Sequence, residues 1–198
     1  MMFRPLLLAA FLLVPAQQSW GAADVAAGQE KAKLCAGCHG VAGISSMPGI
    51  PSLAGQQDQF IQWQLVFFQT GRRVNAAMTA LTEAMSDDDI RNLGAYYHSL
   101  PYTGHAEAPD PAVAAKGRTV AEQHKCASCH TDSFRGERAA PAIADQREDY
   151  LIKALKDYRA ADRPSVGVAA MNEAAAGLDD EEIVAVATYL ATLEPAAQ

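Results

Sequence analysis

One short motif occurs twice in this chain and uses all 4 of its cysteines. It reads Cys-Ala-Gly-Cys-His at 35–39 and Cys-Ala-Ser-Cys-His at 126–130. The pattern Cys-x-x-Cys-His is typical of covalent haem c attachment, in which two thiols add to the two vinyl groups of one macrocycle and the histidine becomes an axial iron ligand. The chain is therefore predicted to carry two covalently bound haem c groups. The predicted thioether residues are Cys35, Cys38, Cys126 and Cys129, and the predicted axial histidines are His39 and His130.

Paired cysteines have other uses that compete with this interpretation. Cys-x-x-Cys also occurs in redox-active dithiols, in half of a zinc site and in disulfides. A single four-ligand zinc site built from both pairs leaves the two histidines unexplained, and it does not predict the longer repeat described below. Two copies with histidine in the same place and no cysteine left over favour haem.

The first residues have the composition of a secretory leader. Arg4 precedes an apolar run over 6–14, and small residues follow at 21–23. These features are typical of a signal peptide, here 1–23, with cleavage expected near Ala23. An uncleaved membrane anchor is the alternative, but the apolar run is too short to span a bilayer. Export to the periplasm agrees with the motif, because bacteria attach haem c in that compartment.

The chain is acidic, with a formal net charge of −7. Nucleic-acid binding needs clustered Lys and Arg, so no nucleic-acid partner is expected. The acidity is concentrated in the second half: 10 basic and 16 acidic residues fall in 106–198, against 5 and 7 in 24–105. Such a half suits a basic partner protein, and it is equally typical of an ordinary solvated surface.

A longer repeat surrounds the motif. Cys35 recurs as Cys126, and Pro-Ser-Leu-Ala-Gly-Gln at 51–56 recurs as Pro-Ala-Ile-Ala-Asp-Gln at 141–146. Matches continue beyond these segments with offsets that change by only a few residues, as loop insertions produce. The pattern predicts a duplication that yields domain 1 at 24–103, a proline-containing linker at 104–110 and domain 2 at 111–198.

Apolar residues recur at helical spacing in each half, and no alternating strand pattern is present. Phe60, Ile61 and Leu65 are spaced to form one buried helix face. Ser86 before three aspartates is typical of a helix N-cap. The predicted fold is all-α, with about three main helices per domain around the haem. They are expected near 24–36, 56–71 and 86–100 in domain 1, and near 111–126, 147–160 and 179–193 in domain 2.

An iron that only transfers electrons is normally closed by a second axial ligand, and a methionine thioether is one such ligand. Met78 and Met171 share one position in the repeat, 12 residues before the matched Ile90 and Ile183. They are predicted to be the sixth ligands. Simple packing is the alternative for any methionine. It is the interpretation for Met85, and neither Met85 nor Met47 has a methionine counterpart in the second half.

Residues outside the motif are candidates for supporting each haem. The carbonyls of Pro51 and Pro141 are expected to accept a hydrogen bond from the proximal histidines, which would fix ring orientation and basicity. The alternative is that these prolines only shape a turn. Guanidiniums that follow the second helix either offset propionate charge or are simply solvated, and they are Arg72, Arg73 and Arg163.

With these motifs in place, the chain resembles the cytochrome c4 family of exported dihaem proteins with two class I cytochrome c domains. The resemblance rests on Cys-Ala-Gly-Cys-His-Gly at 35–40, Pro-Ser-Leu-Ala-Gly-Gln at 51–56 and Gly-Arg-Arg-Val-Asn-Ala-Ala-Met at 71–78. The second copy departs at Asp145 and Ala161, where the first has glycine. The resemblance implies two tandem cytochrome c domains, His/Met ligation at both irons, facing haem edges and electron delivery to a terminal oxidase.

The predicted function is single-electron transfer between a respiratory donor and an acceptor such as a terminal oxidase. Two closed irons leave no position for substrate, and no hydrolase or nucleotide motif competes, so no enzyme activity is expected. Expected partners are redox proteins, namely a membrane donor, an oxidase or a periplasmic dehydrogenase, with peripheral membrane association also open. One alternative is the dihaem subunit of a dehydrogenase of the flavocytochrome c sulfide dehydrogenase type. Another is an enzyme with one open iron.

Overall fold

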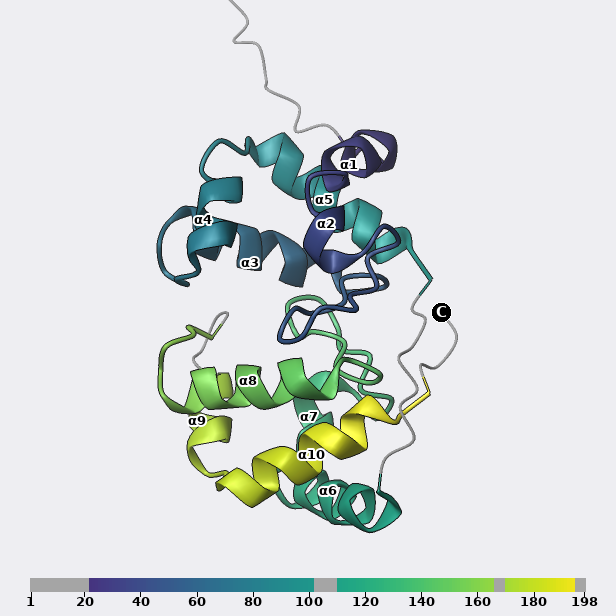
Figure 1. Ribbon diagram of the computed structural model, residues 1–198, viewed down its shortest axis with the longest axis vertical. Helices are drawn as coiled ribbons and strands as arrows, with labels where there is room; N and C mark the ends of the chain where they lie inside the picture. The colour runs from purple at the N-terminus through teal and green to yellow at the C-terminus, as the bar shows by residue number, and fades with distance from the viewer. Residues whose placement is uncertain (1–21, 102–109, 166–169, 195–198) are drawn as a thin grey trace, which may run out of the picture.

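The computed structural model describes residues 22–101, 110–165 and 170–194, and the folded parts of these ranges are helical. Within them no strand forms, and a lone antiparallel bridge joins Glu137 and Ala140. Figure 1 shows two helical domains stacked on one another, with loops of both facing across the middle. The all-α prediction is therefore confirmed. The expected signal peptide and linker fall almost wholly outside the described residues.

The N-terminal domain is built on a crossing of its first and last helices. Helix α1 packs against α5, and α3 packs against the other side of α5. The α1–α5 crossing is close, because a Cβ added to Gly28 would lie 2.1 Å from the carbonyl oxygen of Asn92. The helices are α1 (Val25–Ala32), α2 (Ala36–His39), α3 (Asp58–Gln69), α4 (Ala76–Thr82) and α5 (Asp87–Ser99).

The C-terminal domain repeats this arrangement. Helix α6 packs against α10 in a similarly close crossing, since a Cβ added to Gly117 would lie 1.9 Å from the carbonyl oxygen of Ala185. Helix α8 packs against both α10 and α9. The helices are α6 (Pro111–Gln123), α7 (Ala127–His130), α8 (Glu148–Arg159), α9 (Ala170–Ala176) and α10 (Asp180–Ala191). The predicted duplication is thus present in the fold.

The prediction of three main helices per domain was correct but incomplete. The long helices begin and end within a few residues of their expected bounds, and capping boxes at Ser86 and Asp179 start α5 and α10. The sequence analysis missed α2, α4, α7 and α9, which have only four to seven residues. Segments this short bury too little of one face to produce a periodic apolar pattern.

Each domain has its own apolar core, and Met85 belongs to the first. It is 8% exposed and packs with residues of α3 and α5, so its interpretation as core filler is confirmed. The second core centres on α10, where Ile183 and Ala187 are fully buried. Among the described residues no helix is long and apolar enough to cross a membrane.

Candidate haem-binding site

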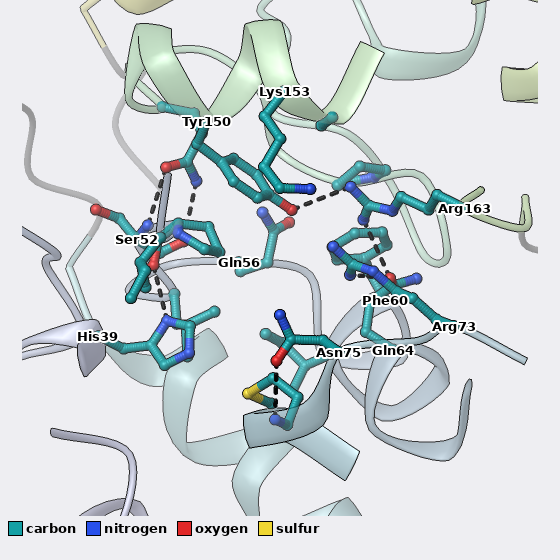
Figure 2. Close-up of a pocket in the computed structure, with 18 of the residues that line it drawn as sticks. His39, Ser52, Gln56, Phe60, Gln64, Arg73, Asn75, Tyr150, Lys153 and Arg163 are labelled. Carbon is teal, nitrogen blue, oxygen red and sulfur yellow. Dashed lines mark hydrogen bonds between the residues drawn. The ribbon is translucent and has the colours of Figure 1, made fainter. Parts of the chain in front are cut away.

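The predicted ligand residues of both domains converge on one cavity of about 700 Å³. His39 and Met78 line it from the N-terminal domain, and His130 and Met171 line it from the C-terminal domain. Figure 2 shows His39 and Asn75 on one side of this cavity and Tyr150 on the opposite side. Much of the remaining wall is aliphatic and aromatic. Two positions assigned from a sequence repeat therefore lie around a shared apolar space.

The cysteine motifs form short helical turns that carry the histidines inward. The backbone N–H of His39 donates to the carbonyl of Cys35 at 2.9 Å, and His130 donates to Cys126 at 3.0 Å. Cys38 and Cys129 are exposed, and no disulfide joins any of the four cysteines. Among the described residues no three His, Cys, Asp or Glu side chains are gathered around a common point.

Both histidines are buried and held by the prolines that follow them. Nδ1 of His39 lies 2.9 Å from the carbonyl oxygen of Pro51, and Nδ1 of His130 lies 2.9 Å from that of Pro141. This confirms the predicted role of the two prolines. Burial lowers the pKa of both rings against the opposing effect of these contacts, which favours the neutral form. With Nδ1 engaged, Nε2 is the nitrogen that each ring has left for a metal.

The two predicted methionine ligands lie on short helices. Met78 is in α4, which follows α3, and Met171 is in α9, which follows α8. Asn75 caps α4, and its Oδ1 accepts the backbone N–H of Met78 at 3.0 Å. Next to Met171, the amide of Asn172 donates to the carbonyls of Tyr158 and Arg163 at 2.8 and 2.9 Å. Each helix is thus anchored beside its methionine, whereas the unmatched Met47 is largely exposed and does not line the cavity.

Two cationic side chains from different domains meet at the cavity wall. Gln64 Oε1 accepts from Arg73 Nη1 at 2.6 Å and from Arg163 Nη2 at 3.1 Å. Arg163 also donates to the hydroxyl of Tyr150 at 3.0 Å. Within the described ranges neither guanidinium forms an ion pair, and the buried Arg163 Nε and Gln64 Nε2 have no hydrogen-bond partner.

This cluster tests whether the cavity fits haem. Burial, together with the nearby charge of Arg163, lowers the pKa of Arg73. Burial opposes ionisation of Tyr150, but the two guanidiniums outweigh it and lower the pKa of this phenol to about 8. Among the described residues Asp157 attracts Arg163 without forming an ion pair with it. Buried cations are costly unless they are paired, so the cluster favours a bound anion. Haem propionates are such anions, and the residues fit the group.

The three candidate arginines differ in where their side chains lie. Arg73 and Arg163 line the cavity, whereas Arg72 is exposed and stacks 4.7 Å above the ring of Phe67, away from the lining. Arg72 follows helix α3 at a position that points outward, which residue type alone does not reveal.

Sequence analysis missed three polar residues at the domain boundary. Gln56 and Gln146 match each other in the repeat, and this signal was available. Gln64 has alanine as its counterpart, so the repeat holds no hint of its role. The contact that matters for Gln64 is with Arg163, a residue 99 positions away.

Family models match both halves of the chain. The model "Cytochrome c" matches residues 114–194, and the model "Cytochrome C oxidase, cbb3-type, subunit III" matches residues 23–96. With two helical domains, each holding a Cys-x-x-Cys-His turn beside an apolar cavity, these matches define the class: c-type cytochromes with two covalently bound haem c groups.

The chain belongs to the cytochrome c4 family. It is 33% identical over 179 residues to cytochrome c4 of Pseudomonas aeruginosa, covering 85% of this chain and 88% of that protein. A crystal structure of reduced recombinant cytochrome c4 from Pseudomonas stutzeri matches with a TM-score of 0.81 and 29% identity, over 87% of this chain and 100% of the other. The chain is thus a dihaem electron carrier rather than an enzyme.

Two further matches carry dehydrogenase names. A "thiosulfate dehydrogenase electron acceptor" of Thiomonas intermedia is 31% identical over 183 residues, covering 87% of this chain and 84% of that protein. A structure of thiosulfate dehydrogenase from Marichromatium purpuratum in its as-isolated form matches with a TM-score of 0.79 and 30% identity. The match covers 88% of this chain and 41% of the other.

Proposed function

We propose that the protein is a periplasmic shuttle that takes single electrons from a respiratory donor and passes them to an acceptor such as a terminal oxidase. The observation that carries this proposal is the shared cavity, lined by the axial candidates of both domains. In this proposal the two haems lie beside one apolar space and exchange electrons within the molecule. The leader 1–23 directs export with cleavage near Ala23, and the mature chain comprises 24–103, 104–110 and 111–198.

Each domain holds its haem with four side chains. Cys35 and Cys38 form the thioethers of the first haem, with His39 and Met78 as axial ligands. The second set is Cys126, Cys129, His130 and Met171. When bound, haem supplies a one-electron ferric–ferrous couple. The protein keeps both irons closed to substrate, orients the histidines through proline carbonyls, and places Arg73 and Arg163 where they offset propionate charge.

A second candidate function is the acceptor unit of a periplasmic dehydrogenase. The expectation from sequence was a partner of the flavocytochrome c sulfide dehydrogenase type. The name of the Thiomonas relative and the match to thiosulfate dehydrogenase favour a thiosulfate-oxidising partner instead. Electron transfer itself is the same in both candidates; only the donor differs. A permanent partner would make the protein a subunit, whereas transient partners make it a shuttle.

Native mass separates the two candidates. The haem-staining protein of a gentle periplasmic extract is sized, and the same peak is examined for flavin and for reduction by added thiosulfate. The shuttle predicts the mass of one chain or a homodimer, without flavin and without direct reduction. A larger peak with a second polypeptide that reduces the haems on thiosulfate addition establishes the dehydrogenase subunit. A larger peak with flavin would instead identify the partner as a dehydrogenase of the flavocytochrome c sulfide dehydrogenase type.

A further inference from the structure

Two buried glutamines cross the domain boundary in opposite directions. The backbone N–H of Ser52 donates to Gln146 Oε1 at 2.9 Å, and Gln146 Nε2 donates to the carbonyl of Ser52 at 2.9 Å. In return, Gln56 Oε1 accepts from the N–H of Ala142 at 2.7 Å, and Gln56 Nε2 donates to the carbonyl of Ala142 at 3.0 Å. Each amide thus pairs with one residue of the other domain as a strand neighbour would.

The glutamines are rigidly placed. Gln56 is 4% exposed and Gln146 is 3% exposed. Each Oε1 also accepts the N–H of the next residue in its own chain segment, Gln57 at 2.8 Å and Arg147 at 3.1 Å, where α3 and α8 begin. A buried amide with its hydrogen bonds formed in this way holds a defined position, and breaking one bond leaves an unsatisfied group.

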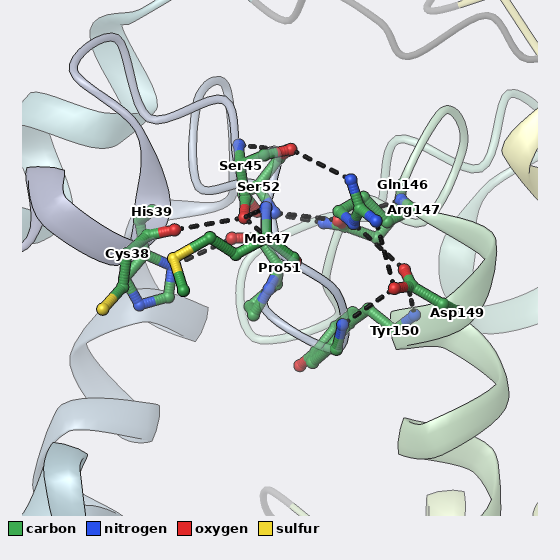
Figure 3. Close-up of polar contacts among 11 residues, drawn as sticks. Cys38, His39, Ser45, Met47, Pro51, Ser52, Gln146, Arg147, Asp149 and Tyr150 are labelled. Atoms are coloured by element: carbon green, nitrogen blue, oxygen red, sulfur yellow. Dashed lines mark hydrogen bonds and ion pairs between the residues drawn. The ribbon is translucent and has the colours of Figure 1, made fainter.

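The peptide groups that these glutamines contact are the same ones that hold the proximal histidines. The carbonyl of Pro51 accepts from His39, and the N–H of that same Pro51–Ser52 peptide donates to Gln146. Figure 3 shows Pro51 and Ser52 between His39 and Gln146. The Pro141–Ala142 peptide has the same two contacts, with His130 on its carbonyl and Gln56 on its N–H.

We propose that each glutamine is a positioning residue that tunes the axial histidine of the opposite domain. Gln146 acts on His39 and Gln56 acts on His130, each through one polarised peptide group. The inference rests on the proposed function, in which these histidines ligate iron. It makes each reduction potential depend on the packing of the other domain.

The direction of the effect follows from hydrogen-bond cooperativity. A peptide whose N–H is engaged carries a more negative carbonyl, and chains of such bonds strengthen one another by roughly 10–30% per bond. A stronger acceptor at Nδ1 makes the imidazole a more electron-rich ligand, which favours the ferric state. Removing the glutamine amide therefore weakens the contact at Nδ1 and raises the reduction potential of the haem across the boundary.

The test uses the full-length holoprotein with both haems attached. In Gln146→Leu, the Nδ1 proton of His39 in the reduced, diamagnetic state is expected to move upfield in the NMR spectrum, while that of His130 stays in place. Gln56→Leu is expected to do the reverse. In each variant one of the two midpoint potentials rises. Gln146→Met and Gln56→Met, which keep an unbranched side chain, repeat the measurement if leucine disturbs folding.

The matched control removes a neighbouring boundary contact that does not reach a proline peptide. Gln57 Nε2 donates to the carbonyl of Arg135 at 2.9 Å, so Gln57→Leu loses a bond between domains and leaves both Nδ1 protons unmoved. Equal movement of both protons in every variant, movement within the same domain, or none at all overturns the proposal. Failure of the ligand assignment is recognised separately, because a histidine off the iron has no haem ring-current shift even in the wild type.

Discussion

The two domains share a fold but differ in the residues at four matched turns. At each turn φ is positive, the region that side chains other than glycine rarely occupy. The N-terminal domain has glycine at all four, and the C-terminal domain has a side chain at all four. The matched residues are Gly40 and Thr131, Gly43 and Phe134, Gly55 and Asp145, and Gly71 and Ala161.

The same turns therefore form in both domains, although the residues of the C-terminal domain disfavour a positive φ. A non-glycine residue in the left-handed region costs about 1–2 kcal/mol. Phe134 offsets this by burial, since it is 7% exposed and packs edge-on against Tyr189 at 6.0 Å between ring centroids. Thr131 is only half-buried and Ala161 is exposed, so burial stabilises these two residues less. We infer that the turns are dictated by the loop that holds the haem, and that the C-terminal domain is the more strained copy.

The largest expected effect comes from removing the sixth iron ligand of one domain while leaving that of the other domain in place. Met78→Ala and Met171→Ala should each remove the thioether from one haem only, so each should lose about half of the low-spin His/Met signal in the ferric spectrum. The potential of the affected haem should fall, because thioether ligation favours the reduced state. Met47→Ala is the control and should change neither. Unchanged ferric spectra in both methionine variants would refute the ligand assignment.

A second comparison exchanges the residues that follow the histidines. Thr131 has φ 67° and ψ 164°, a region that is nearly exclusive to glycine and costs about 1–3 kcal/mol, so Thr131→Gly should stabilise the C-terminal domain. Gly40→Thr should destabilise the N-terminal domain by more, since an added Cβ would meet the carbonyl oxygen of Ile44 at 2.0 Å. Denaturant unfolding followed by haem absorbance measures both. Shifts of the same sign would contradict the account of strain.

Substitutions at the turn after the second long helix of each domain test backbone strain without steric crowding. A Cβ added to Gly71 would meet no atom within 4 Å, and its counterpart Ala161 has φ 61°. Gly71→Ala should therefore destabilise, and Ala161→Gly should stabilise, each by about 1 kcal/mol. The same unfolding experiment applies. If Gly71→Ala is neutral, conformational strain does not distinguish the domains at this turn.

The smallest expected effect concerns one charged contact at the boundary between the domains. Asp149 Oδ2 accepts the N–H of Gly49 at 2.8 Å, and Asp149 pairs with Arg147. Burial raises the pKa of Asp149, but the bonds from Arg147 and Gly49 outweigh it and lower the pKa overall. An unfolded aspartate titrates near pH ~3.9. The contact is therefore fully present above that pH and is lost as pH falls through the lower folded value.

This acid effect has a local reporter. The amide proton of Gly49 should move upfield in the wild type as the pH falls through the lowered pKa of Asp149, below the ordinary value of about 3.9, because its acceptor loses charge. In Asp149→Asn the same proton should lie upfield at neutral pH and show no such titration. An acid shift that persists in the variant would assign the effect to another group.

The sequence by itself determined the cofactor chemistry, the all-α class and the duplication. Two Cys-x-x-Cys-His motifs are local signals, and a repeat such as the one that pairs Met78 with Met171 is visible without coordinates. The proline carbonyls at Pro51 and Pro141 were also predictable, because they follow each motif at a nearly constant distance. Local spacing contains this information because a covalent cofactor must be bound by residues close together in the chain.

Only the tertiary structure decided how the two copies meet. Gln146 contacts Ser52 across 94 residues, and Arg163 contacts Gln64 across 99. Hydrogen bonds of this kind depend on how two packed surfaces are placed. A sequence does not show whether a given glutamine or arginine is exposed or buried at such a boundary. The short helices that hold the methionines were missed for a related reason. They are stabilised by the Asn75 cap in α4, by the side-chain hydrogen bonds of Asn172 in α9 and by contacts with the rest of the domain, rather than by a periodic apolar face of their own.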